Sequence, residues 1–86
     1  AVAPREAEDP WTRRDDSVTL HQLLDTLEED QRVVFIMIEL ENMTAPEIAA
    51  VLDLKVPTVY SRLRLAREAM RRAVARYLAR TKERAP

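Results

Sequence analysis

A stretch near the C-terminus constrains the fold of this chain most, because it has the apolar period of a long helix. From Pro57 to about Lys82, apolar side chains recur at steps of four and three residues, and arginines occupy much of the remainder. The apolar positions are Val59, Leu63, Ala66, Met70, Ala73 and Tyr77. This spacing places all six on one side of an α-helix. We therefore expect one long amphipathic helix with a continuous inward stripe.

A first, shorter helix is predicted to begin at Ser17, which can cap a helix N-terminus. Its apolar positions follow the i, i+3, i+4, i+7 pattern of an amphipathic helix. They are Leu20, Leu23, Leu24 and Leu27.

The segment from Gln31 to Glu41 contains the run V-V-F-I-M-I, which alone has strand propensity. Its flanks are charged helix formers and no other segment alternates to pair with it, so we predict a helix. Such a helix is apolar on nearly every side. Either it is fully buried, or one side is an open apolar groove that marks a protein interface around Phe35 and Ile38.

A break at 41–43 precedes a third, short helix. Thr44 and Glu47 have the spacing of a capping box, and Pro46 falls in the first turn, where proline is tolerated. The helix ends before Pro57, and Asp53 lies in the turn, where a left-handed backbone is often needed.

A short helix, a tight turn and a second helix with a basic outer side predict a helix-turn-helix. All elements taken together, the predicted fold is all-α: a small bundle of about four helices that contains a helix-turn-helix and ends in a long recognition helix. We divide the chain into a flexible linker or tail at 1–16, a DNA-binding domain at 17–82 and a frayed tail at 83–86.

Charge separates the two parts of the chain. Residues 1–54 carry 4 Lys and Arg and 13 Asp and Glu, a net charge of −9, whereas residues 55–86 carry 10 and 2, a net charge of +8. The basic part favours an anionic partner.

Several classes of function are excluded by composition. The 86 residues contain no Cys, no Gly and one His. We therefore expect no thiolate metal site, no glycine-rich phosphate loop, no cofactor, no catalytic residues and no enzyme. The longest apolar run, Val33 to Ile38, is too short for a bilayer. We expect a cytoplasmic protein that does not bind a membrane. Because the chain begins with Ala, we also expect it to be a piece of a longer one.

The polar side of the last helix suits DNA. At about 100° per residue, the side opposite Val59 and Leu63 carries Pro57, Thr58, Ser61, Arg64, Leu65 and Glu68, flanked by Tyr60, Arg62 and Arg67. Arginine can pair with guanine, hydroxyl groups reach bases or phosphates, and an apolar side chain can contact a thymine methyl. Lys55, at the helix start, favours a phosphate.

The segment from Leu24 to Arg72 resembles region 4, the C-terminal domain, of bacterial RNA polymerase sigma factors of the extracytoplasmic-function (ECF) group. The resemblance is carried by L-D-T-L-E-E-D-Q-R-V-V-F at 24–35 and M-T-A-P-E-I-A-A-V-L-D-L-K-V-P-T-V-Y-S-R-L-R-L-A-R-E at 43–68. The most specific part is T-V-Y-S-R-L-R-L-A-R-E. The match covers more than half of the chain.

The resemblance implies a four-helix domain whose last helix reads the promoter −35 element. It implies that Tyr60, Ser61, Arg64 and Leu65 read bases, with Arg62 and Arg67 near the DNA backbone. It also implies that an apolar concave side binds the flap of the polymerase beta subunit. The candidate partner-binding residues are Leu27, Val34, Phe35 and Ile38.

The chain departs from the family pattern in several places. Position 28 is Glu where family members often have Pro, and position 53 is Asp where they usually have Gly. Lys55 stands at the cap of the last helix, where Ser or Pro is usual, and Leu65 stands where a basic residue is common. The last change makes an unusual base preference the expectation.

Two alternatives remain open. The domain could be an interaction module held by an anti-sigma factor, or the DNA-binding output domain of a LuxR-type response regulator. The run S-R-L-R-L-A-R-E argues against the response regulator.

Overall fold

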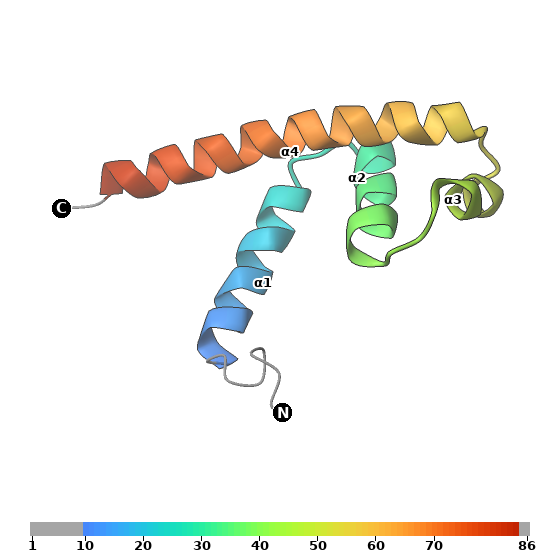
Figure 1. Ribbon diagram of the computed structural model, residues 1–86. Helices are drawn as coiled ribbons and strands as arrows, with labels where there is room; N and C mark the ends of the chain where they lie inside the picture. Colours follow the sequence, from blue (N-terminus) through green and yellow to red (C-terminus); the bar gives the residue numbers. More distant parts are fainter. Residues whose placement is uncertain (1–9, 85–86) are drawn as a thin grey trace.

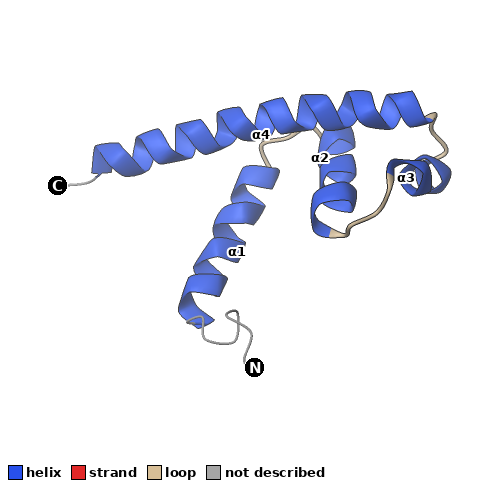
Figure 2. Ribbon diagram, in the orientation of Figure 1, coloured by secondary structure: helices blue, strands red, loops and turns tan. Residues whose placement is uncertain are grey.

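The computed structural model describes residues 10–84, and within that range the chain is all-α, as predicted. The α-helices are α1 (Pro10–Leu24), α2 (Glu29–Phe35), α3 (Ala45–Leu52) and α4 (Val56–Arg84), and a π-helical segment, η2 (Ile36–Leu40), continues α2. Figure 1 shows α4 as one long rod with α1, α2 and α3 all on the same side of it. Short loops join the helices (Figure 2). Among the helices of residues 10–84, none covers the other side of α4.

The first helix begins earlier than the sequence predicts. α1 begins at Pro10, so Ser17 lies inside the helix instead of capping it, and residues 10–16, which were predicted to be flexible, are helical. Proline at a first helical position costs nothing, because its missing N–H would have no intrahelical partner there. Residues 1–9, the rest of the predicted linker, lie outside the described part of the chain.

The segment after α1 is helical rather than extended, which confirms the prediction for 31–41. α2 passes into η2 at Ile36, and the N–H of Glu41 donates to the carbonyl of Ile36 at 3.0 Å, five residues back. Asn42 then adopts a left-handed backbone with φ 58°. The helix therefore ends within the predicted break at 41–43.

The start of α3 is the predicted capping box. The hydroxyl of Thr44 accepts from the N–H of Glu47, and the carboxylate of Glu47 accepts from the N–H of Thr44. At the other end, Asp53 is left-handed, with φ 57° and ψ 51°. Both ends of α3 are thus set by the local sequence.

The core lies where α2 and α3 pack on the first half of α4. Its fully buried side chains are Val34, Ile48 and Val59, at 0% exposure. The other members of this cluster are Ala45, Ala49 and Leu63. Four more residues are buried outside this cluster: Leu24, Leu27, Ala66 and Ala73.

The fold is thin for its length, with extents of 48 × 39 × 15 Å. Only α4 runs the full width, and each other helix packs against a part of it (Figure 1). No helix within residues 10–84 is long and apolar enough to cross a membrane.

Candidate nucleic-acid interface

The interface is built on the pair α3 and α4, which cross at a tight turn. In Figure 1, α3 is seen almost end-on while α4 lies in the plane of the view, so their axes cross. Ala49 is 7% exposed in this part of the core, and its small side chain suits a close crossing. In the turn, the N–H of Leu54 donates to the carbonyl of Ala49 at 2.9 Å. This is the predicted helix-turn-helix arrangement.

The two sides of α4 differ as predicted. Val59 and Ala66 are 0% exposed and Leu63 is 5% exposed, so the apolar stripe faces the core. On the opposite side, Ser61 and Arg64 are exposed. α4 therefore presents polar side chains on the side that no other helix covers.

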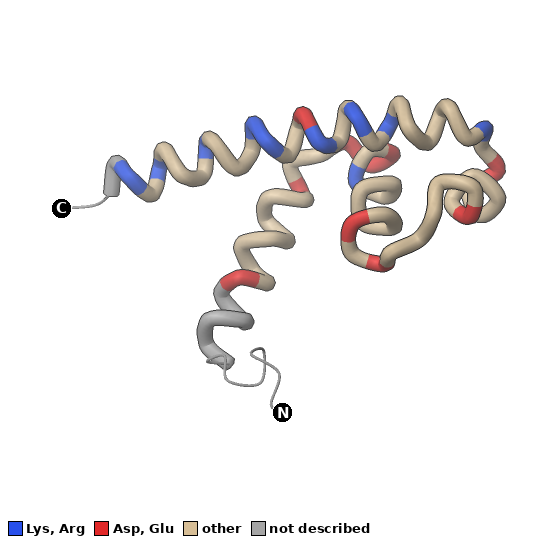
Figure 3. The backbone as a smooth tube through the Cα atoms, viewed as in Figure 1, with Lys and Arg blue, Asp and Glu red and all other residues tan. Residues whose placement is uncertain are grey.

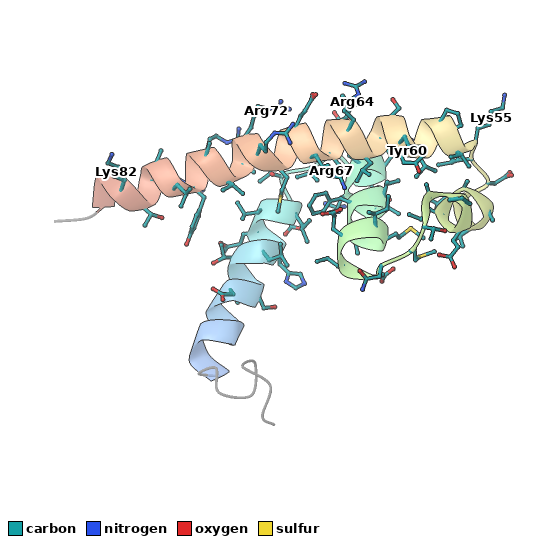
Figure 4. The ribbon with its side chains drawn as sticks, viewed as in Figure 1. Lys55, Tyr60, Arg64, Arg67, Arg72 and Lys82 are labelled. Carbon is teal, nitrogen blue, oxygen red and sulfur yellow. The ribbon has the colours of Figure 1, made fainter. Side chains whose placement is uncertain are left out.

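Four of the predicted DNA-contacting residues are clearly accessible on α4. Tyr60 is 57% exposed and Leu65 is 40% exposed. The Arg64 side chain is 66% exposed, and in Figure 4 it points away from the other helices. Ser61 lies between Tyr60 and Arg64 and is exposed. Lys55, just before α4, is exposed as well.

Three other predicted residues lie at the edges of this surface. Thr58 is half-buried. The guanidinium of Arg62 lies 3.8 Å from the carboxylate of Asp30 in α2. Nη2 of Arg67 donates to Oε1 of Glu39 in η2 at 2.8 Å, and in Figure 4 Arg67 lies on the α2 side of α4. The sequence pattern did not reveal these two pairings.

The outward side of α4 also contains an ion pair of its own. The guanidinium of Arg64 lies 3.6 Å from the carboxylate of Glu68, one turn further along. An exposed i, i+4 pair of this kind contributes only a few tenths of a kcal/mol, about 0.3–0.5. Arg64 can therefore exchange Glu68 for a base or a phosphate at little cost.

Figure 3 shows how the charge separation of the sequence appears in space. Lys and Arg lie along α4, whereas Asp and Glu lie mostly on the other helices and their loops. In the sequence of α4, Glu68 interrupts the basic series. The basic side is thus one helix and not a scattered set of charges.

An apolar groove lies beside α4, where η2 and the end of α2 meet its second half. Its lining residues are Phe35, Glu39, Arg67, Met70, Arg71, Val74, Ala75 and Leu78. Leu78 is 58% exposed. Val34 is the one buried residue of the segment 31–41, so the fully buried alternative is wrong. Phe35 lines the groove, whereas Ile38, the other residue predicted for it, does not.

The groove contains only one of the four candidate partner-binding residues, Phe35. Leu27 and Val34 are 4% and 0% exposed, so they belong to the core and a partner cannot contact them in this fold. Ile38 is half-buried against the core cluster. These residues were assigned from apolar character alone, which does not distinguish core from groove.

The α4 wall of the groove lies outside the predicted partner-binding residues. Met70, Val74 and Leu78 follow one another at intervals of four residues. This spacing forms a second apolar line beside the core stripe, since residues four apart are neighbours on a helix surface. The signal was present, but Met70 was assigned to the inward stripe alone.

Among the side chains of residues 16–82, no group of three or more His, Asp or Glu is placed to hold a metal ion.

The fold and this surface define a helix-turn-helix DNA-binding domain. The family model for sigma-70, region 4 matches residues 17–70. The chain belongs to this family, whose domains bind the promoter −35 element and interact with RNA polymerase. A comparison with curated proteins gives no significant match.

Proposed function

We propose that this domain reads the −35 element for a sigma factor of the ECF group. The first half of α4 enters the major groove, and Tyr60, Ser61, Arg64 and Leu65 contact base edges. The observation that carries this proposal is the exposure of these four side chains opposite the buried stripe of Val59, Leu63 and Ala66.

The chemistry of the four side chains supports base reading. Arg64 can donate two hydrogen bonds to the O6 and N7 acceptors of guanine, and Leu65 can contact a thymine methyl. An exposed leucine at this position, where the family has basic residues, favours a base preference that includes an A·T pair. Lys55 and the first turn of α4 bind phosphate and so fix the position of the helix.

We further propose that the apolar groove beside α4 binds the flap of the polymerase beta subunit. A short amphipathic helix suits this groove, because its lining is mostly apolar and also includes the charged residues Arg67, Arg71 and Glu39. A domain held at once by DNA and by the polymerase works in the cytoplasm and as a binding module, not as an enzyme.

An anti-sigma factor is a second candidate partner. The open apolar groove favours it, because a helix of an inhibitor could occupy the same walls as the flap. In that state the domain would be held as an interaction module.

Selection of duplexes from a random pool tests the DNA-reading proposal. We expect an enriched sequence whose binding weakens steeply with salt, because neutralised phosphates release counterions. Enrichment of no sequence together with salt-independent binding would contradict the proposal. Core polymerase and an anti-sigma factor can then be compared as ligands of the groove.

A further inference from the structure

The two arginines at the edges of the DNA-binding surface are each held by a carboxylate from α2 or η2. Arg67 donates to Glu39 at 2.8 Å, across 28 residues of sequence. Arg62 lies 3.8 Å from Asp30. Both pairs join α4 to the acidic part of the chain.

The positions of the two arginines are related by the helix. They are five residues apart, which is about 140° around α4 at 100° per residue. Each therefore lies at one boundary between the buried stripe and the outward surface. A long side chain at such a boundary can extend either toward the neighbouring helix or toward the backbone of a duplex that contacts α4.

We propose that Asp30 and Glu39 limit the phosphate-dependent part of DNA binding by holding Arg62 and Arg67. The inference depends on the proposed DNA-reading function. Sequence-independent affinity comes mainly from Lys and Arg charges that replace condensed counterions on phosphates. An arginine already neutralised by a carboxylate releases few counterions when it binds a phosphate. The carboxylate that it leaves stays close to the phosphate and repels it. The base contacts proposed for Arg64 and Leu65 do not involve these two carboxylates.

The two carboxylates act to different degrees. The Glu39 pair is a charge-assisted hydrogen bond, which is the stronger kind. The Asp30 pair is beyond hydrogen-bond distance, although the Arg62 side chain is only 31% exposed. We expect Glu39 to have the larger effect.

The test measures the affinity of a short mixed-sequence duplex at several salt concentrations. Glu39→Gln, Asp30→Asn and the control Glu41→Gln each remove one negative charge. Glu41 is exposed in the loop after η2, and it forms no ion pair with any residue of 16–82. Only the first two substitutions release a guanidinium. Thermal unfolding followed by circular dichroism verifies that each variant is folded.

We expect Glu39→Gln to steepen the slope of log affinity against log salt by about 0.9 relative to Glu41→Gln. Between about 50 and 200 mM salt this difference corresponds to an extra loss of affinity of about three- to fourfold. The slope for Asp30→Asn should lie between the slopes for Glu39→Gln and Glu41→Gln. In an Arg67→Gln background, Glu39→Gln should no longer change the slope.

Equal slopes for Glu39→Gln and Glu41→Gln would overturn the inference while leaving the DNA-reading function intact. Weaker binding of the duplex by Glu39→Gln would also overturn the inference. That result would mean that the Glu39–Arg67 pair favours DNA binding by orienting α4. If the wild-type domain binds no duplex at any salt concentration, the proposed function fails first and the inference with it.

Discussion

Thr44 and Glu47 satisfy each other's backbone at the start of α3. The N–H of Thr44 donates to Oε1 of Glu47 at 2.8 Å, and the N–H of Glu47 donates to Oγ1 of Thr44 at 3.3 Å. The bond from the Thr44 backbone, followed by the Thr44 side chain, lowers the pKa of Glu47. This cap determines where α3 begins, and α3 braces the DNA-reading half of α4.

The first prediction concerns the stability of this cap and its dependence on pH. Thr44→Ala should lower the free energy of unfolding by about 1 kcal/mol. Because the pKa of Glu47 is lowered in the folded state, its carboxylate stabilises the fold above the ordinary glutamate pKa of 4.5. That contribution is lost as the pH falls through the lowered pKa.

Glu47→Gln separates charge from geometry, since its amide oxygen can still accept from Thr44. Urea unfolding at a series of pH values should show wild type more stable than this variant at neutral pH. The difference should shrink toward zero in acid. A difference that stays constant with pH would show that the charge of Glu47 does not stabilise the cap.

The second prediction concerns the turn between α3 and α4. Asp53 has φ 57°, a conformation in which a Cβ is unfavourable. Asp53→Gly removes the Cβ but also gains entropy in the unfolded chain, so we expect a net stabilisation of about 0.5 kcal/mol. Asp53→Val should destabilise by more than about 1 kcal/mol, because a β-branched residue fits this conformation poorly. Urea midpoints in the reverse order would contradict the steric explanation.

The third prediction assigns a role to Arg64. Arg64→Ala should weaken binding to the selected duplex by roughly 1–3 kcal/mol and relax the preference at one base pair. The matched control is Arg76→Ala, an exposed arginine of the second half of α4. Arg76→Ala should weaken binding to all duplexes by a similar amount, and by less than Arg64→Ala weakens binding to the selected duplex. A uniform loss with Arg64→Ala would reassign this residue to a phosphate contact.

The fourth prediction tests the apolar groove. Leu78 lines it and is 58% exposed, so Leu78→Asp should leave the fold intact. It should reduce binding to core RNA polymerase at least about tenfold, since a buried leucine contributes roughly 1.5–3 kcal/mol.

Leu40→Asp is the control for the groove. Leu40 is 47% exposed in η2 and does not line the groove. We expect both variants to bind a duplex with the affinity of wild type. Equal loss of polymerase binding by the two variants would place the interface elsewhere.

Much of the fold was predictable because it is local. The capping box at Thr44 and Glu47, the left-handed Asp53 and the long stripe of α4 depend on residues close in sequence. The start of α1 was predicted wrongly, because Ser17 is a good cap in isolation and Pro10 is an equally permissible start.

The candidate site was predictable in part for the same reason. The helical period of a single element places Ser61, Arg64 and Leu65 on the outward side, and the family resemblance adds Tyr60 to them as a base reader. The structure leaves all four exposed. For the groove, the sequence predicted only the side formed by the helix at 31–41. Its α4 wall and the position of Val34 in the core depend on how two helices pack against each other.

The sequence by itself determined the helices apart from the start of α1, both ends of α3 and the side of α4 that faces outward. Short-range hydrogen bonds and the period of 3.6 residues act within one segment. Only the tertiary structure decided which apolar side chains are core and which line a groove. It also decided that Glu39 and Asp30 hold the edge arginines. The physical reason is that burial and ion pairing depend on which surfaces come into contact, and those contacts join residues far apart in the chain.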